Sequence, residues 1–216
     1  MAVFEIEGKP GEFYDDENGR TFSIKDLRED IKYDSVSVNA GLMVAGTEFE
    51  FYDALAGKRR IDTNFATAHR LSAGEEMVIE RVGFYLRQAA GNLLPPPADF
   101  KRCVDDGHLN FLINGLLLAE GPCFRFQTGF GFAGNTNEAG NGVISIGVPS
   151  TAAAWRLVLK QYIHHLHDIN STLTFFARNW QANQNLVAGD QMPTFTTIQT
   201  VTSVLYGRVK RATTKG

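Results

Sequence analysis

The feature that most constrains the fold of this chain is a series of short apolar or alternating runs, cut by Gly, Pro, Asn and Asp, that follows residue 34. In TEFEFYD, CFRFQ and STLTFFARNW apolar and polar residues alternate, as in a strand with one face on a core. Roughly eight to ten such runs follow one another without alternating helices, which is typical of a β-sandwich or barrel. The order predicts an all-β, antiparallel fold and excludes a parallel α/β sheet.

The dipeptide Asn114–Gly115 lies inside the apolar run FLINGLLL. The tightest hairpin turns need positive φ at both central positions, which Asn and Gly tolerate better than other residues. We therefore expect two antiparallel strands to meet at this turn.

One segment near the start of the chain has the period of a helix. In SIKDLREDIKYD, Ser23 can cap the first turn, and Ile24, Leu27 and Ile31 recur at helical spacing. We predict a short amphipathic helix on an N-terminal arm, residues 1–35, followed by one β-sandwich domain, residues 36–216. The narrow apolar stripe would contact either the chain's own domain or a neighbouring subunit.

Two stretches between the runs are predicted as long loops. NLLPPPADFKRCVDDG carries a proline triplet that cannot join a central strand ladder, and FGFAGNTNEAGNG is rich in Gly and Asn. Long loops in a compact domain usually carry function or contact something. The second stretch lacks a GK[ST] motif, so we do not expect it to cradle a phosphate.

Composition and charge exclude several classes of protein. The net charge of −3 gives no overall attraction to nucleic acid or to an anionic membrane. The first residues have no basic and apolar leader pattern, and no apolar run approaches the ~20 residues of a membrane span. We therefore expect synthesis in a cytoplasm, where Cys103 and Cys123 would remain thiols.

The segment HHLHD raises the question of a metal site. On a strand, His165 and His167 would project to the same face and could bind one metal ion. An HxH pair also opens the cupin metal motif, but the glutamate and glycine that follow in cupins are missing here. The alternative is that one strand ends and turns, with Asp168, Asn170 and Ser171 as turn residues. We favour the turn and expect no metal or other cofactor.

The order of segments resembles that of the jelly-roll capsid proteins of tailless icosahedral phages and viruses. The similarity lies in RIDTNFATAHRLSAGEEMVIERVGFYLRQ, HLNFLINGLLLAEGPCFRF, WRLVLKQYIHHLHDINSTLTFFARNW and SVLYGRVKRATTKG, within residues 45–211. The resemblance implies a single jelly-roll barrel without enzymatic activity. It also implies assembly with copies of itself and with other virion proteins into a shell made in the host cytoplasm.

A shell subunit would bury apolar residues between copies and could contact a packaged genome. The candidate subunit contacts are Ile24, Leu27, Ile31, Phe130 and Phe132. The basic residues that could contact nucleic acid or an acidic partner are Arg59, Arg60, Arg208, Lys210 and Arg211. Contacts to phosphate would depend on salt concentration. A solvated, unpartnered face is the alternative for these basic residues.

Two other classes of protein stay open at this point. A cupin-type metal-dependent enzyme would bind metal through His165 and His167. A carbohydrate-binding β-sandwich or a phage spike would expose an aromatic side chain such as Trp155 or Trp180 on one face.

Overall fold

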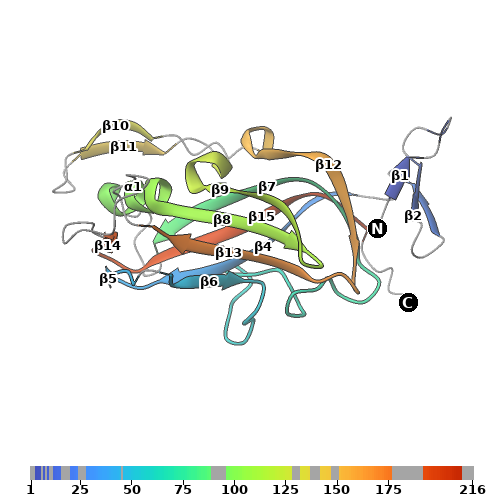
Figure 1. The fold of residues 1–216 in the computed structure, drawn as a ribbon, viewed down its shortest axis with the longest axis horizontal. Helices are drawn as coiled ribbons and strands as arrows, with labels where there is room; N and C mark the ends of the chain where they lie inside the picture. The colour runs from blue at the N-terminus through green and yellow to red at the C-terminus, as the bar shows by residue number, and fades with distance from the viewer. Residues whose placement is uncertain are drawn as a thin grey trace, which may run out of the picture.

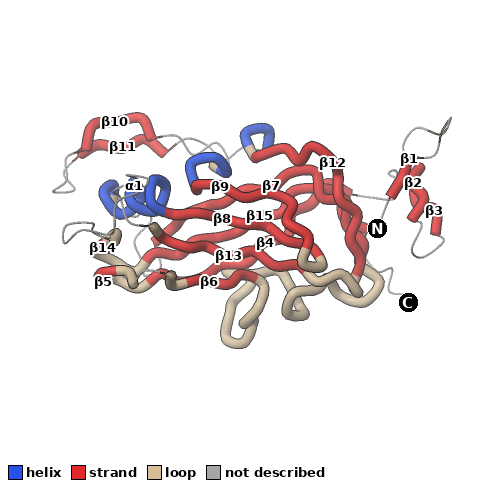
Figure 2. The backbone as a smooth tube through the Cα atoms, viewed as in Figure 1, coloured by secondary structure: helices blue, strands red, loops and turns tan. Residues whose placement is uncertain are grey.

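The computed structural model describes residues 3–5, 7, 9, 12–15, 20–23, 28–44, 46–88, 96–127, 132–136, 142–146, 151–176 and 192–210. Within these residues the fold is mostly β-strand in antiparallel sheets, with α1 as its α-helix (Figures 1 and 2). The prediction of an all-β, antiparallel fold is confirmed at this level.

Two four-stranded sheets make up the body of the molecule. The first has the strand order β12-β7-β15-β4 and the second has the order β6-β13-β8-β9. The strands of the first sheet are β4 (Arg28–Val38), β7 (Glu76–Gln88), β12 (Trp155–His164) and β15 (Gln199–Lys210). The strands of the second are β6 (Glu48–Phe51), β8 (Gly107–Ile113), β9 (Leu116–Pro122) and β13 (Ile169–Phe175).

The hydrophobic core receives side chains from both sheets. Burial alternates along β8 and β13, so that Leu109, Phe111 and Leu173 point inward while their neighbours are partly exposed. Ile79 and Val201 contribute to the same core from the first sheet. The two sheets therefore pack face to face over one core, as the period-two pattern requires.

Smaller elements surround the two sheets. They are the three-stranded sheet β1 (Val3–Glu5), β2 (Glu12–Asp15) and β3 (Arg20–Ser23), the pair β10 (Phe132–Thr136) and β11 (Gly142–Ile146), the pair β5 (Gly41–Leu42) and β14 (Thr194–Phe195), and the short helices η2 (Cys123–Phe126) and η3 (Thr151–Ala153).

The hairpin predicted at Asn114–Gly115 is confirmed. β8 and β9 pair on either side of this turn, and φ is 49° at Asn114 and 75° at Gly115. Both values lie in the left-handed region that the turn requires.

The predicted N-terminal helix is wrong over the part that the structure describes. Residues 28–38 form β4, and Ile31 lies opposite Tyr206 of β15. The ladder with β15 pairs β4 along its length on the side that faces the sheet, which outweighs the weak local helical spacing. Ile24 and Leu27 lie outside the described residues, and β4 runs through residue 35, the predicted end of the arm.

The two predicted loops both contain regular structure. NLLPPPADFKRCVDDG contains α1 (Pro97–Asp106), and FGFAGNTNEAGNG contains β10. Pro97 stands in the first turn, where the missing N–H would have no intrahelical partner, so the prolines start a helix. The second loop pairs with the segment that follows it, β11, in an antiparallel ladder. Phe130 and the side chain of Phe132 lie outside the described parts of the chain.

A buried carboxylate fixes α1 to the chain before β15. Asp99 is fully buried and accepts hydrogen bonds from the backbone N–H groups of Thr196 and Thr197 at 3.0 Å and from Gln199 Nε2 at 3.0 Å. Arg102 forms an ion pair with the same carboxylate at 3.1 Å. Because these donors belong both to α1 and to the segment around the start of β15, Asp99 holds the two together and has a structural role.

Candidate functional site

The HHLHD segment connects β12 of the first sheet with β13 of the second. β12 ends at His164, the chain turns, and β13 begins at Ile169. The backbone N–H of Asp168 donates to Asn114 Oδ1 at 2.8 Å, and the N–H of Asn114 donates to the carbonyl of Asp168 at 2.8 Å. The predicted turn is confirmed in its position, but Asn170 and Ser171 belong to β13.

The histidines that meet in this turn are not the predicted pair. The rings of His164 and His167 have centroids 3.9 Å apart, and both residues are buried. Their Nδ1 atoms accept backbone N–H groups inside the turn: His167 Nδ1 from His164 at 2.8 Å, and His164 Nδ1 from Leu166 at 3.2 Å. His165 is half-buried. Among the described residues, no group of three His, Cys, Asp or Glu side chains is arranged to hold a metal ion.

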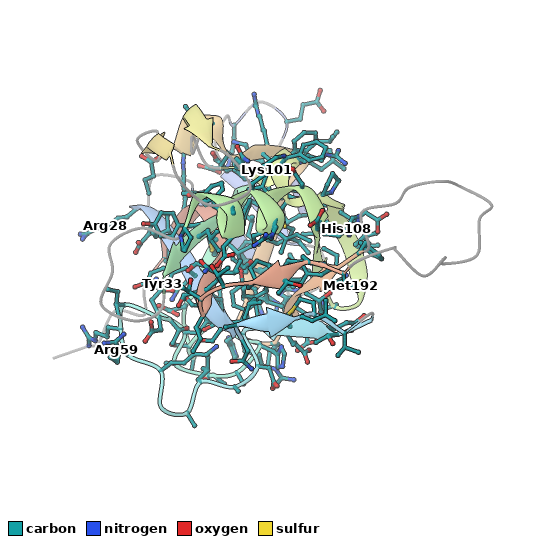
Figure 3. All side chains as sticks on the ribbon, turned by 90° about the vertical axis from the view of Figure 1, so that its left-hand side faces the viewer. Arg28, Tyr33, Arg59, Lys101, His108 and Met192 are labelled. Carbon is teal, nitrogen blue, oxygen red and sulfur yellow. The ribbon has the colours of Figure 1, made fainter. Side chains whose placement is uncertain are left out.

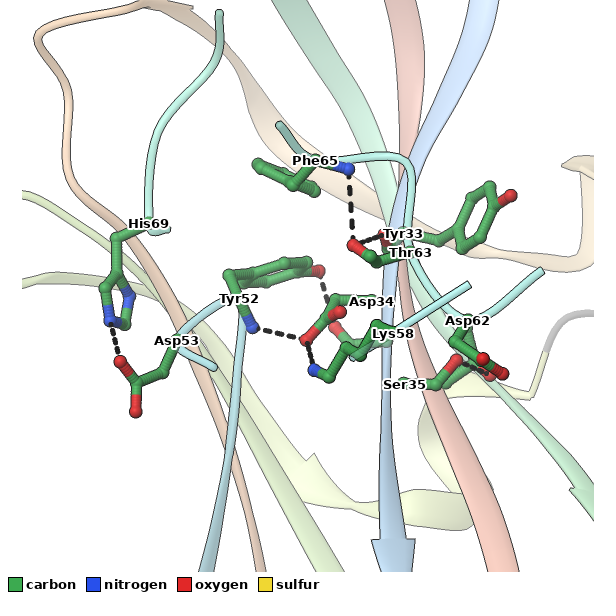
Figure 4. A network of polar contacts seen from close by, with 12 residues as sticks. Tyr33, Asp34, Ser35, Tyr52, Asp53, Lys58, Asp62, Thr63, Phe65 and His69 are labelled. Atoms are coloured by element: carbon green, nitrogen blue, oxygen red, sulfur yellow. Dashed lines mark hydrogen bonds and ion pairs between the residues drawn. The ribbon is translucent and has the colours of Figure 1, made fainter. Parts of the chain in front are cut away.

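A buried polar network joins β4, β6 and the loop that follows β6 (Figure 4). Asp34 is fully buried, and its Oδ2 accepts from the N–H of Tyr52 at 2.7 Å and from Lys58 Nζ at 2.6 Å. The Tyr52 hydroxyl is hydrogen-bonded to Ser203 Oγ at 2.7 Å. Burial raises the pKa of Tyr52 well above its usual value, the hydrogen bond with Ser203 opposes this, and Asp34 adds to it. The phenol is therefore neutral, and the network positions the loop.

A second ion pair, between Lys32 and Glu75, also involves β4. Lys32 Nζ donates to both oxygens of Glu75 at 2.9 and 3.0 Å, and the N–H of Ser72 donates to Glu75 Oε2 at 3.0 Å. Burial alone would raise the pKa of Glu75, but the donors Lys32 and Ser72 outweigh it, and the pKa is lowered. This pair connects β4 with the turn before β7.

A pocket of about 470 Å³ lies beside the Asp34–Lys58 ion pair. Three of its lining residues are small, Ala54, Ala56 and Gly57. The other lining residues are Ser35, Val36, Ser37, Glu50, Lys58, Arg59, Asp62 and Thr200. The pocket therefore lies at the edge of the two sheets where β4 and β6 contact each other; we call it the edge pocket.

The predicted basic residues fall into two groups. Arg59 and Arg60 lie in the loop after β6, where both are exposed and Arg59 forms an ion pair with Asp62 at 3.2 Å (Figure 3). Arg208 and Lys210 lie on β15.

The β15 pair faces carboxylates of β7. Arg208 forms an ion pair with Glu80 at 3.7 Å, and Lys210 forms one with Glu76 at 3.5 Å. Arg211 lies outside the described residues. Because Arg59, Arg208 and Lys210 each have an acidic partner within the chain, they do not form an uncompensated basic surface.

The elements at the edge opposite the edge pocket also carry exposed apolar side chains. We call this surface the apolar edge; it consists of Leu116 and Leu117 of β9, Phe124 of η2, and Val158 and Leu159 of β12. η2 links the two strands, because Arg125 donates to the carbonyl of Glu120 at 2.9 Å and its guanidinium lies 3.9 Å from the ring centre of Trp155. In Figure 1, β9, η2 and β12 lie together on the side away from β6.

Val158 and Leu159 project from a bulge in β12. The pairing with β7 shifts between Arg156, which faces Arg81, and Gln161, which faces Ile79. Residues 157–160 thus face Glu80 alone, and the excess chain bends outward. Val158 is 98% exposed and Leu159 72%.

Sequence analysis missed this bulge, although a signal was available. Three consecutive apolar residues, Leu157 to Leu159, break the alternation expected of a strand with one buried face. The ion pairs at the β4–β6 edge have no comparable sequence pattern, because Asp34 and Lys58 are 24 positions apart and Lys32 and Glu75 are 43 apart.

Comparisons of the chain with family models, with curated proteins and with solved structures find no match. In the parts of the chain that the structure describes, the helices are too short and too polar to cross a bilayer. Trp155, a candidate sugar platform, is half-buried and carries the Arg125 guanidinium on its ring. Trp180 lies outside the described residues.

Proposed function

We propose that the two sheets form a jelly roll and that the protein is a self-assembling shell subunit of a virus particle. In this role it would be made in a host cytoplasm and end in the virion, beside copies of itself and other virion proteins. Contact with a packaged genome is part of the proposal.

The nesting of the strand pairs supports the jelly-roll assignment. Of the eight strands in the two sheets, the first pairs with the last (β4 with β15), the second with the seventh (β6 with β13), the third with the sixth (β7 with β12), and the fourth with the fifth (β8 with β9). Successive pairs alternate between the sheets. One long antiparallel hairpin rolled into two facing sheets has this arrangement, and eight-stranded jelly rolls are common in capsid and lectin domains and in cupins.

The observation that carries the proposed function is the apolar edge. Exposed apolar patches mark contacts with another macromolecule, and the neighbouring residues Val158 and Leu159 are among the most exposed apolar side chains of the described residues. Val158 and Leu159 lie on an outward bulge, so they cannot be covered by the strand that pairs with β12. A second copy of the chain is the partner that a shell subunit requires.

The proposal is tested by mass photometry of the purified protein over a range of protein and salt concentrations, with negative-stain microscopy and metal analysis of the same sample. A shell subunit gives closed particles of uniform mass whose fraction rises with concentration and which contain no stoichiometric metal. A monomer at every concentration, or a metal-loaded monomer or dimer, would reject the proposal.

A further inference from the structure

We propose that the Val158–Leu159 bulge of one copy inserts into the edge pocket of the next copy. The inference rests on the proposed function, because it takes a second copy of this chain as the occupant of the pocket. It specifies which two surfaces meet and that copies join head to tail.

The bulge and the pocket lie on opposite edges of the same two sheets. β12 is one edge strand of the first sheet, and β4, which lines the pocket with Ser35, Val36 and Ser37, is the other. Each copy therefore offers one protrusion and one hollow in opposite directions. Such surfaces join head to tail, and head-to-tail contacts close into rings when the rotation between copies allows it.

The shapes of the two surfaces favour this pairing over a symmetric one. A two-fold contact would place bulge against bulge and leave the edge pocket unfilled. The pocket of about 470 Å³ includes the small residues Ala54, Ala56 and Gly57 in its lining. Small residues at this position leave space for the nearly fully exposed side chains of Val158 and Leu159, whose burial is favourable at ~25 cal/mol per Å² before the cost of association.

The charges beside the two surfaces are complementary. Within the pocket, Lys58 is paired with Asp34, and Arg59 with Asp62. Glu50 accepts a hydrogen bond from the neutral amide of Asn170 at 2.7 Å, which leaves its negative charge uncompensated by that contact.

Beside the bulge, the flanking residues are basic. Lys160 forms an ion pair with Glu80 at 3.1 Å, and Arg156 is exposed two residues before Val158. When the bulge enters the pocket, Arg156 of one copy is the cation available to Glu50 of the next. Such pairs set the register and specificity of a contact.

The first test is disulfide trapping between two single variants. Leu159→Cys and Ala56→Cys are purified separately, mixed under assembly conditions and oxidised with diamide; Cys103 and Cys123 are buried and stay in place. We expect cross-linked heterodimers in the mixture and few in either variant alone. Ala66→Cys, an exposed alanine outside the pocket lining, is the matched control. Equal yields with Ala66→Cys, or a predominance of Leu159→Cys homodimers, would overturn the inference.

The second test is a charge exchange. Glu50→Arg and Arg156→Glu should each weaken association roughly tenfold. The double variant should regain most of the loss, because the two charges are exchanged and attract each other again. Glu48→Arg, on the same strand but outside the pocket lining, should have little effect. Additive losses in the double variant would contradict the pairing of Arg156 with Glu50.

The two tests separate this inference from the proposed function. If the unmodified protein forms closed particles but Leu159→Cys and Ala56→Cys do not cross-link, the head-to-tail contact is wrong and the shell function stands. If the unmodified protein is a monomer at every concentration, the shell function fails, and the contact fails with it.

Discussion

The two edges of the molecule differ in which side chains they bury and which they expose. At the β4–β6 edge, charged groups are buried: Asp34 has no exposed surface, and Lys32 is almost fully buried. At the β9–β12 edge, apolar groups are exposed, with Val158 and Leu159 standing out from a bulge. The buried ions of the charged edge have their partners within one chain. The apolar edge leaves these side chains exposed on the single chain.

This difference separates folding from association. A buried ion that loses its partner destabilises the fold, because the remaining charge is left in a poor solvent. An exposed apolar side chain contributes little to the fold, so its removal should affect only contacts with other molecules. Variants of the two edges should therefore change different measurements.

The largest effect on stability is expected for Asp34→Ala. The change leaves Lys58 and the N–H of Tyr52 without their shared acceptor, and removal of one partner from a buried pair costs about 3–5 kcal/mol. Urea denaturation followed by circular dichroism measures the loss. Asp53→Ala is the control: its contact with His69 Nε2 is more exposed, and the expected cost is below about 1 kcal/mol. Equal losses for the two variants would mean that the Asp34 network does not stabilise this edge.

A smaller effect is expected for Glu75→Gln. Gln keeps the size of the side chain but leaves Lys32 without a counter-charge, and hydrogen bonds to charged groups contribute about 1.5–3 kcal/mol. Because the pKa of Glu75 is lowered in the folded state, its stabilisation is complete above the unfolded value of about 4.3 and is lost as the pH falls through the folded pKa.

The pH dependence of this variant sharpens the prediction. The difference in unfolding free energy between the unmodified protein and Glu75→Gln, measured by urea denaturation, should be largest at neutral pH and should shrink below about pH 4. A difference that stays constant between pH 7 and pH 3 would contradict the role of the Lys32–Glu75 pair.

Arg125→Ala tests the link between β9 and β12. The guanidinium lies 3.9 Å from the ring centre of Trp155, and a cation–π contact of this kind contributes about 0.5–1 kcal/mol when exposed. We expect a loss of this size in urea denaturation and a change in tryptophan emission. Arg156→Ala, which changes an exposed arginine next to Trp155, should leave stability unchanged; a loss as large as that of Arg125→Ala would show that the ring contact is not the cause.

The smallest effect on stability is expected for Leu159→Asp. Its side chain is largely exposed, so the unfolding free energy should change by no more than about 0.5 kcal/mol. Assembly measured by mass photometry should be lost, because a charge then stands in an apolar contact. Val44→Asp, which changes another largely exposed apolar residue outside the apolar edge, should assemble like the unmodified protein. A Leu159→Asp protein that unfolds far more easily would place this residue in the fold rather than in a contact.

The sequence predicted those parts of the fold that depend on neighbouring residues. The Asn114–Gly115 turn and the alternation in TEFEFYD and STLTFF are local, and the hairpin, β6 and β13 appear where expected. The prediction of a strand at CFRFQ was wrong, because Cys123–Phe126 forms η2. The helix predicted around Ile31 failed because the partner of this segment is Tyr206 and its neighbours on β15, far along the chain. The prolines before α1 were taken as loop residues, although Pro97 is compatible with the first turn of a helix.

The candidate site was only partly accessible from the sequence. The turn at HHLHD was predicted, but the contact of His164 with His167 arises from the bend between them and not from the strand geometry that would pair His165 with His167. The edge pocket could not be foreseen, because its lining comes from β4, β6, the following loop and β15.

Hydrogen–deuterium exchange of the assembled protein, compared with that of the Leu159→Asp variant, tests most directly whether the apolar edge is covered by another copy. The amides of residues 157–160 should exchange more slowly in the assembled protein than in the variant, together with those of residues 54–57 in the edge pocket. Assembled particles in which residues 157–160 exchange as fast as in the variant would contradict the account.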